Sequence, residues 1–181
     1  MQRINPVDSD RSHGKVKELL DVVQSKFGMT PKMTTTMAQS SAVLEGYLNF
    51  SDALGKGELK AELREQIALL SAEINRCGYC ASAHTAIGKL VGLTDGEILN
   101  ARRGRSNDEQ TSIALNFVRN VIVNRGQVAD SDVDALREAG FSAGEIGEIV
   151  ANVAINIFTN YFNIIADTEI DFPAVEIGAA A

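Results

Sequence analysis

The stretch Leu59–His84, LKAELREQIALLSAEINRCGYCASAH, contains both cysteines of the chain and a helical apolar pattern that leads into them. The apolar positions that recur three or four residues apart are Leu59, Leu63, Ile67, Leu70 and Ile74. The motif Cys77-x-x-Cys80 follows, and His84 comes four residues after Cys80. Because helical positions three and four apart share a face, the pattern predicts that both sulfurs and the imidazole point into one small volume.

Helical periodicity continues over most of the chain. Comparable apolar patterns cover residues 16–27, 43–54, 87–91 and 113–122. No segment shows the sustained apolar and polar alternation of a strand bounded by hairpin turns. The sequence therefore predicts an all-α fold, a compact single-domain helical bundle over residues 1–181 with about seven to nine helices.

The segment 142–166 predicts the last long helix and has an unusual polar pattern. Four asparagines fall within about 80° of arc at helical spacing: Asn152, Asn156, Asn160 and Asn163. Nearly every other position between residues 146 and 165 is apolar or small. A helix that is apolar around most of its circumference is normally buried on most sides, so we expect contacts with a second subunit of a homo-oligomer. The alternative is a central helix whose narrow amide stripe faces water. The tail 168–181 is expected to run along the surface.

The composition is that of an ordinary globular protein of 181 residues, with 45% hydrophobic and 23% charged residues. A net charge of −7 argues against a surface for nucleic acid or anionic membranes. One basic cluster, Arg102, Arg103 and Arg105, stands where a helix is predicted to end. There the positive charges are expected to complement the helix dipole rather than to bind phosphate.

The N-terminal segment, residues 1–14, is polar and lacks the apolar core of a signal peptide. No uninterrupted run of 18 apolar residues occurs in the sequence. We therefore expect a cytoplasmic protein without a membrane span. In that compartment structural disulfides are rare, and a cysteine pair is more often catalytic or metal-binding.

Two thiols beside a histidine suit redox chemistry, because only the thiolate is a nucleophile and a nearby base generates it. Attack on a peroxide leaves a sulfenic acid, which a second thiol converts to a disulfide. Since His84 lies four residues after Cys80, Cys80 is the candidate attacking thiol and Cys77 the resolving one, and the reverse order stays open. Glu65 would orient His84 if the chain bends within residues 75–78, where helix propensity is low.

The arrangement Glu65-x11-Cys77-x-x-Cys80-x3-His84 resembles the alkylhydroperoxidase D and carboxymuconolactone decarboxylase family. The resemblance extends over about residues 59–104. It implies a homo-oligomeric all-α protein that reduces hydroperoxides, with these four residues as a proton relay. It also implies an external dithiol reductant, a lipoyl or thioredoxin-like protein. One departure is Tyr79, because that family can carry a histidine between the cysteines. A tyrosine with an ordinary pKa near 10 does not shuttle protons at neutral pH, although it can donate a hydrogen bond.

Other interpretations stay open at this point. Decarboxylation of a lactone acid occurs in the same family and, as the resemblance goes, does not rely on a cysteine pair, so Cys77 and Cys80 count against it. The dithiol could instead exchange with protein or small-molecule disulfides. A non-catalytic helical oligomer with buried thiols is a third possibility.

Zinc binding is a further alternative, because Cys77, Cys80 and His84 are three plausible ligands. A structural site needs a fourth, such as a carboxylate, a residue of another subunit, or His13. His13 lies in the polar N-terminal segment and is expected at the surface. The sequence contains no phosphate loop or dinucleotide fingerprint, so no organic cofactor is implied.

Overall fold

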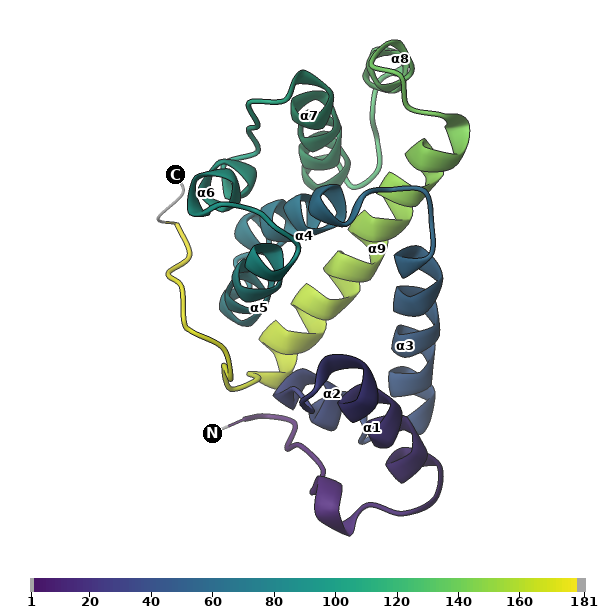
Figure 1. The fold of residues 1–181 in the computed structure, drawn as a ribbon, viewed down its shortest axis with the longest axis vertical. Helices are drawn as coiled ribbons and strands as arrows, with labels where there is room; N and C mark the ends of the chain where they lie inside the picture. Colours follow the sequence, from purple (N-terminus) through teal and green to yellow (C-terminus); the bar gives the residue numbers. More distant parts are fainter. Residues whose placement is uncertain (1, 179–181) are drawn as a thin grey trace.

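The computed structural model describes residues 2–178, and within this range the chain is helical with no strand. The elements are η1 Ser9–Arg11, α1 Gly14–Phe27, α2 Lys32–Met37, α3 Ser41–Gly55, α4 Ala61–Ile74, α5 Gly78–Leu90, α6 Asp95–Arg102, α7 Glu109–Val123, α8 Asp130–Glu138 and α9 Ala143–Ala166. The helices form one domain (Figure 1). The predicted all-α class and the predicted number of helices are confirmed for the described residues.

Helices α4 and α9 organise the bundle. Helix α4 packs against α5, α6, α7 and α9, and α9 also contacts α3, α5 and α7. Helices α1, α2 and α3 pack on one another and lie together at one end of the molecule, where α9 also ends (Figure 1). The motif helix α5 is therefore held between α4, α6 and α9.

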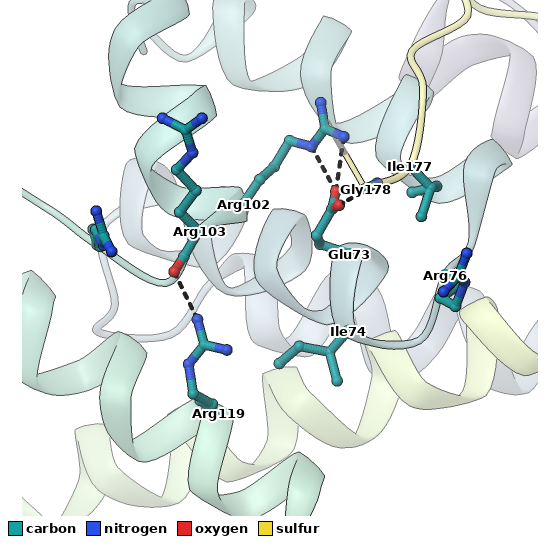
Figure 2. Close-up of a pocket in the computed structure, with 9 residues that line it drawn as sticks. Glu73, Ile74, Arg76, Arg102, Arg103, Arg119, Ile177 and Gly178 are labelled. Carbon is teal, nitrogen blue, oxygen red and sulfur yellow. Dashed lines mark hydrogen bonds and ion pairs between the residues drawn. The ribbon is translucent and has the colours of Figure 1, made fainter. Parts of the chain in front are cut away.

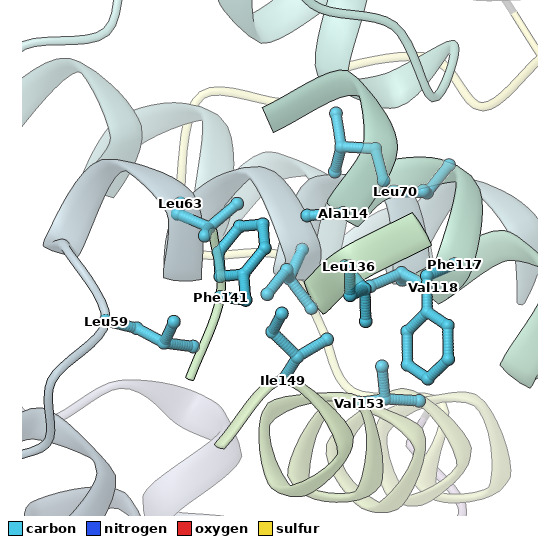
Figure 3. Packing of buried hydrophobic residues seen from close by; sticks show 12 residues of the cluster. Leu59, Leu63, Leu70, Ala114, Phe117, Val118, Leu136, Phe141, Ile149 and Val153 are labelled. Atoms are coloured by element: carbon cyan, nitrogen blue, oxygen red, sulfur yellow. The ribbon is translucent and has the colours of Figure 1, made fainter. Parts of the chain in front are cut away.

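The main core fills the space between α4, α7, α8 and α9 (Figure 3). Its α4 residues are those of the predicted apolar face, and Ile67 and Leu70 are fully buried. A second cluster joins α1, α2 and α3, and a third surrounds the two cysteines. The α4 face that meets α7 and α9 is apolar, and its burial fixes α4 in the middle of the bundle. The C-terminal end of α4 thereby positions the turn that leads into Cys77.

The turn between α4 and α5 reverses the chain directly before the cysteines. The Cys77 N–H donates to the Ala72 carbonyl at 2.9 Å, and the Arg76 N–H donates to the Glu73 carbonyl at 3.2 Å. These are the two hydrogen bonds of a Schellman motif, with Arg76 in the left-handed position at φ 58°. The bend predicted within residues 75–78 is therefore present, and it brings α5 back alongside α4.

Helix α9 buries its asparagine stripe and exposes part of its apolar surface. The asparagine stripe is buried, with exposed fractions between 0% and 6%, so the alternative in which the amides face water is wrong. The opposite face carries exposed large apolar side chains, namely Val150, Phe158, Tyr161, Ile164 and Ile165. Among the described helices, α9 is the one long and apolar enough to cross a membrane, and 44% of the relevant window is buried inside the domain. Its packing against α3, α4, α5 and α7 is that of a core helix.

The segment after α9 lies on the surface but is attached to the motif helix. The Val175 N–H donates to Ser82 Oγ at 3.1 Å, and the Gly178 N–H donates to Glu73 Oε1 at 2.6 Å. Phe172, Val175 and Ile177 pack against the cysteine cluster. The described part of the tail thus covers one side of the motif, and residues 179–181 of the predicted tail lie outside the described residues.

Candidate active site

The two cysteines occupy the start of α5. Cys77 is the N-cap, and its Sγ accepts a hydrogen bond from the Cys80 N–H at 3.2 Å. The two residues are joined by a disulfide with their Cα atoms 5.3 Å apart, and their exposed fractions are 1% and 3%. Since one helical turn already holds both sulfurs within bonding distance, the pair can open and close with little backbone movement.

Glu65 and His84 meet because α4 and α5 fold back on each other. Glu65 Oε2 lies 2.7 Å from His84 Nδ1, although 19 positions separate the two residues in the sequence. Their side chains are 16% and 22% exposed. A carboxylate only accepts hydrogen bonds, so Nδ1 carries the proton of this contact and Nε2 is left for proton exchange. The structure therefore brings together all four residues that the sequence singled out.

Cys80 opens into an apolar cavity of about 170 Å³. Helices α1, α2, α3, α5 and α9, the segment between α1 and α2, and the tail contribute to its wall. The apolar wall residues include Phe27, Met29, Met33, Ala83, Ile87 and Phe172. His84 lines the same cavity, whereas Cys77 is not among the lining residues. An apolar molecule in this cavity would meet the sulfur of Cys80 and the imidazole together.

A second cavity of about 220 Å³, with a mixed polar and apolar lining, also reaches His84. Its lining includes Glu65, Arg64, Ser51, Asn152 and Asn156, in addition to the imidazole. Four residues line both cavities, namely Phe27, Tyr47, His84 and Thr159. The imidazole of His84 thus borders both the cavity that contains the sulfur of Cys80 and the cavity that contains the carboxylate of Glu65.

Asn163 is a site residue that the sequence analysis did not single out. Its Nδ2 donates a hydrogen bond to Cys80 Sγ at 3.4 Å, and the side chain is 3% exposed. The sequence signal was the asparagine stripe at helical spacing in residues 152–163. Nothing in that stripe indicated that its last member would reach the cysteines, because the contact joins residues 83 positions apart.

Tyr79 lines the same cavity as Cys80, but its hydroxyl takes part in a structural hydrogen bond. Burial raises the pKa of its hydroxyl far above the ordinary value, and the nearby Asp171 carboxylate raises it further. The hydroxyl oxygen accepts the Met33 N–H at 3.2 Å, and Asp171 Oδ2 accepts the Lys32 N–H at 2.7 Å. Both residues therefore satisfy N–H groups at the start of α2, where the N-cap Pro31 supplies no side-chain acceptor. Tyr79 joins α5, α2 and the tail and stays neutral.

Replacing Tyr79 with phenylalanine should lower stability and leave peroxide chemistry almost unchanged. The lost hydrogen bond to Met33 is expected to cost about 1 kcal/mol, or roughly 2–4 °C in Tm. Thermal unfolding and the rate of thiol oxidation by a hydroperoxide, measured on the same preparation, check this. A large fall in rate with unchanged stability would contradict the structural role assigned to Tyr79.

A separate hollow of about 700 Å³ is lined by all three residues of the basic cluster (Figure 2). Helix α6 ends at Arg102, as the sequence predicted, and Arg102 pairs with Glu73 at 2.7 Å while also donating to the Glu176 carbonyl. Arg119 donates to the Arg103 carbonyl at the end of α6 at 2.6 Å. These contacts join the end of α6 to α4, α7 and the tail, so the side chains of Arg102 and Arg119 are used in packing.

Metal binding was one alternative for the motif. Among residues 2–178, no group of three or more His, Cys, Asp or Glu side chains is arranged to hold a metal ion. His13, considered as a fourth ligand, is exposed directly before α1.

Residues 41–121 match the carboxymuconolactone decarboxylase family, and this range contains Glu65, Cys77, Cys80 and His84. This match is to the family that the motif predicted.

Solved structures show the same fold. A peroxidase-related protein from Ralstonia eutropha JMP134, described as an alkylhydroperoxidase AhpD core, superposes with a TM-score of 0.85 at 22% identity, over 94% of this chain and 92% of that one. The debrominase Bmp8 in its apo form gives a TM-score of 0.79 at 20% identity, over 98% and 93% of the two chains. The chain thus has the AhpD-like fold.

A curated relative is an alkyl hydroperoxide reductase of Mycobacterium tuberculosis. It is 27% identical over 96 residues, which cover 52% of this chain and 28% of that protein. The match therefore spans little more than a quarter of the relative's length.

Proposed function

We propose that this protein reduces organic hydroperoxides through a dithiol–disulfide cycle of Cys77 and Cys80. The observation that carries the proposal is that Cys80 and His84 line one apolar cavity while Glu65 holds the imidazole at 2.7 Å. The relatives named as peroxidase-related or as alkyl hydroperoxide reductase support the same reaction class.

The first step uses Cys80. His84 Nε2 takes the proton of the Cys80 thiol, and the thiolate attacks the terminal peroxide oxygen. The O–O bond breaks, Cys80 becomes a sulfenic acid, and the alkoxide leaving group receives the proton from the imidazolium to give the alcohol. The hydrogen bond from the helix N-terminus also favours a Cys77 thiolate. We nevertheless assign the attack to Cys80, because its sulfur opens into the cavity that a substrate can enter.

The second step closes the disulfide. Cys77 attacks the sulfenic sulfur of Cys80, and water leaves. An external dithiol, such as a lipoyl or thioredoxin-like protein, then returns two electrons and becomes a disulfide itself. A cycle of this kind requires a reducing compartment, so we propose a cytoplasmic location.

The substrate that fits this site carries an apolar group next to the hydroperoxide. The cavity wall is aromatic and aliphatic, with Phe27, Met29 and Phe172 around Cys80. An apolar substituent gains by leaving water for this wall, and hydrogen peroxide does not. Cumene hydroperoxide is therefore expected to react faster than hydrogen peroxide.

The test mixes fully reduced protein with one equivalent of cumene hydroperoxide and follows thiol content, intact mass and cumyl alcohol over seconds. The expected result is two thiols lost and one alcohol formed per protein, with a Cys77–Cys80 disulfide. Protein alkylated before mixing serves as the control. Thiols that stay reduced for minutes would contradict the proposal and leave disulfide exchange or thiol-independent lactone chemistry.

Reductive debromination is a second candidate. The likeness to the debrominase Bmp8 spans 98% of this chain, and the aromatic side chains of the cavity suit a planar ring. Another solved structure of that debrominase contains 2,3,4-tribromopyrrole. In this reaction the two thiols supply two electrons, a C–Br bond becomes C–H, and bromide and a proton leave as the disulfide forms. Bromide release from tribromopyrrole by reduced protein distinguishes it from peroxide reduction.

We also propose that the exposed apolar face of α9 pairs with a second copy of the chain. Phe158, Tyr161 and Ile165 are 41%, 53% and 61% exposed on this face. Contiguous apolar surface of this kind marks interaction sites. Replacing Ile165 with lysine is expected to shift the protein to monomers in light scattering coupled to size exclusion. The same change at exposed Leu90, on α5, is the control and should leave the oligomer intact.

A further inference from the structure

The asparagine stripe of α9 divides into two parts by its hydrogen bonds. Asn152 and Asn156 donate to carbonyls one turn earlier in α9 itself, each at 2.8 Å. The other two reach outward to the cysteine motif. Asn160 Oδ1 accepts from Asn75 in the α4–α5 turn at 2.9 Å, and Asn163 donates to Cys80 Sγ at 3.4 Å. The C-terminal half of the stripe therefore packs against the α4–α5 turn and the start of α5.

Asn163 stays buried although its amide is only half satisfied. Within residues 2–178 its Oδ1 has no hydrogen-bond partner, while its Nδ2 is directed at the sulfur. An unpaired buried carbonyl oxygen destabilises a fold, and an aliphatic side chain of similar size would avoid that cost. An aliphatic side chain could not donate a hydrogen bond to the sulfur of Cys80, and Asn163 does.

The charge on sulfur decides what this contact does. A disulfide or thiol sulfur is a weak acceptor, whereas a thiolate is a strong one, and hydrogen bonds to an ionised acceptor are about twice as strong as neutral ones. A donor that gains strength when the acceptor ionises favours the ionised form.

From this geometry we infer that Asn163 is a thiolate-stabilising residue, whose amide lowers the pKa of the Cys80 thiol and so prepares Cys80, rather than Cys77, for attack. The role in attack rests on the proposed function, whereas the pKa of the Cys80 thiol can be measured without any peroxide. Cys80 would then be activated from two directions, by Asn163 on α9 and by the Glu65–His84 pair on α4 and α5.

The test titrates Cys80 alone, in the Cys77→Ser background, by the ultraviolet absorbance of the thiolate against pH. The protein lacking both thiols supplies the tyrosine baseline. Asn163→Leu keeps the volume and removes the donor, and we expect the pKa of the Cys80 thiol to rise by about one to two units. Asn163→Asp places a negative charge beside the sulfur, and we expect a larger rise.

Val153→Ala is the matched control. Val153 lies on the same helix, is 2% exposed and packs in the main core away from the cysteines. It should lower thermal stability and leave the pKa of the Cys80 thiol unchanged, which separates loss of packing from loss of the donor.

Two outcomes decide the inference. An unchanged pKa of the Cys80 thiol in folded Asn163→Leu and Asn163→Asp proteins overturns it, whatever their stability and whatever the wild type does with peroxide. A raised pKa in both variants supports it even if the wild type does not consume hydroperoxide, in which case the peroxidase proposal fails separately.

Discussion

Replacing Cys80 with serine is expected to abolish hydroperoxide reduction, whereas replacing Cys77 with serine leaves one reaction per protein molecule and no turnover. The reason is access. Cys80 lines the same cavity as His84, whereas Cys77, the N-cap of α5, is not among the residues that line it. Removal of Cys80 therefore removes the nucleophile, and removal of Cys77 removes only the group that resolves the sulfenic acid.

The measurement is intact mass after one equivalent of cumene hydroperoxide, with a dimedone-type reagent to trap sulfenic acid. Cys77→Ser should gain one oxygen and bind the reagent at Cys80, and Cys80→Ser should show neither change. Ser25→Ala, which changes an exposed serine on α1, is the control and keeps both thiols. Trapping of a sulfenic acid at Cys77 in the Cys80→Ser protein would reverse the roles assigned here.

Replacing His84 with glutamine should slow the oxidation of Cys80 by about 10²–10⁴-fold, because a general base and acid of the first step is lost. Glutamine retains hydrogen-bonding capacity and roughly the side-chain length, so the packing between the two cavities is preserved. Stopped-flow measurement of the first oxidation in the Cys77→Ser background reports this step alone. His13→Gln, at an exposed position before α1, is the matched control and should react like the parent protein.

Glu65→Gln should give a smaller loss than His84→Gln. The imidazole remains, but it loses the carboxylate oxygen that accepts the hydrogen bond from Nδ1, with 2.7 Å between the two atoms. Glu62→Gln, one turn earlier on α4 and exposed, removes the same charge outside the site. Equal effects of Glu65→Gln and Glu62→Gln would mean that Glu65 acts through net charge rather than by orienting the imidazole.

Several features of this protein follow from the sequence because their physics is local. Apolar spacing of three and four residues predicted the helices, and the short segment of low helix propensity before Cys77 predicted the bend that lets Glu65 reach His84. The predicted fold and family are confirmed, and the position of the cysteine pair at a helix start follows from that bend. These properties depend on residues that are only a few positions apart, so they can be predicted from the sequence.

The features that only the tertiary structure decided involve partners far apart in the chain. The asparagine stripe and the apolar face of α9 were both visible in the sequence, but periodicity alone does not say which face points inward. Asn160 and Asn163 find their partners about 85 positions away, at Asn75 in the α4–α5 turn and at Cys80 in the first turn of α5. In the same way, Tyr79 turned toward α2 because Met33 and Asp171 surround its hydroxyl there. Local sequence thus determined the helices and the motif, and long-range packing determined which side chains meet the sulfur.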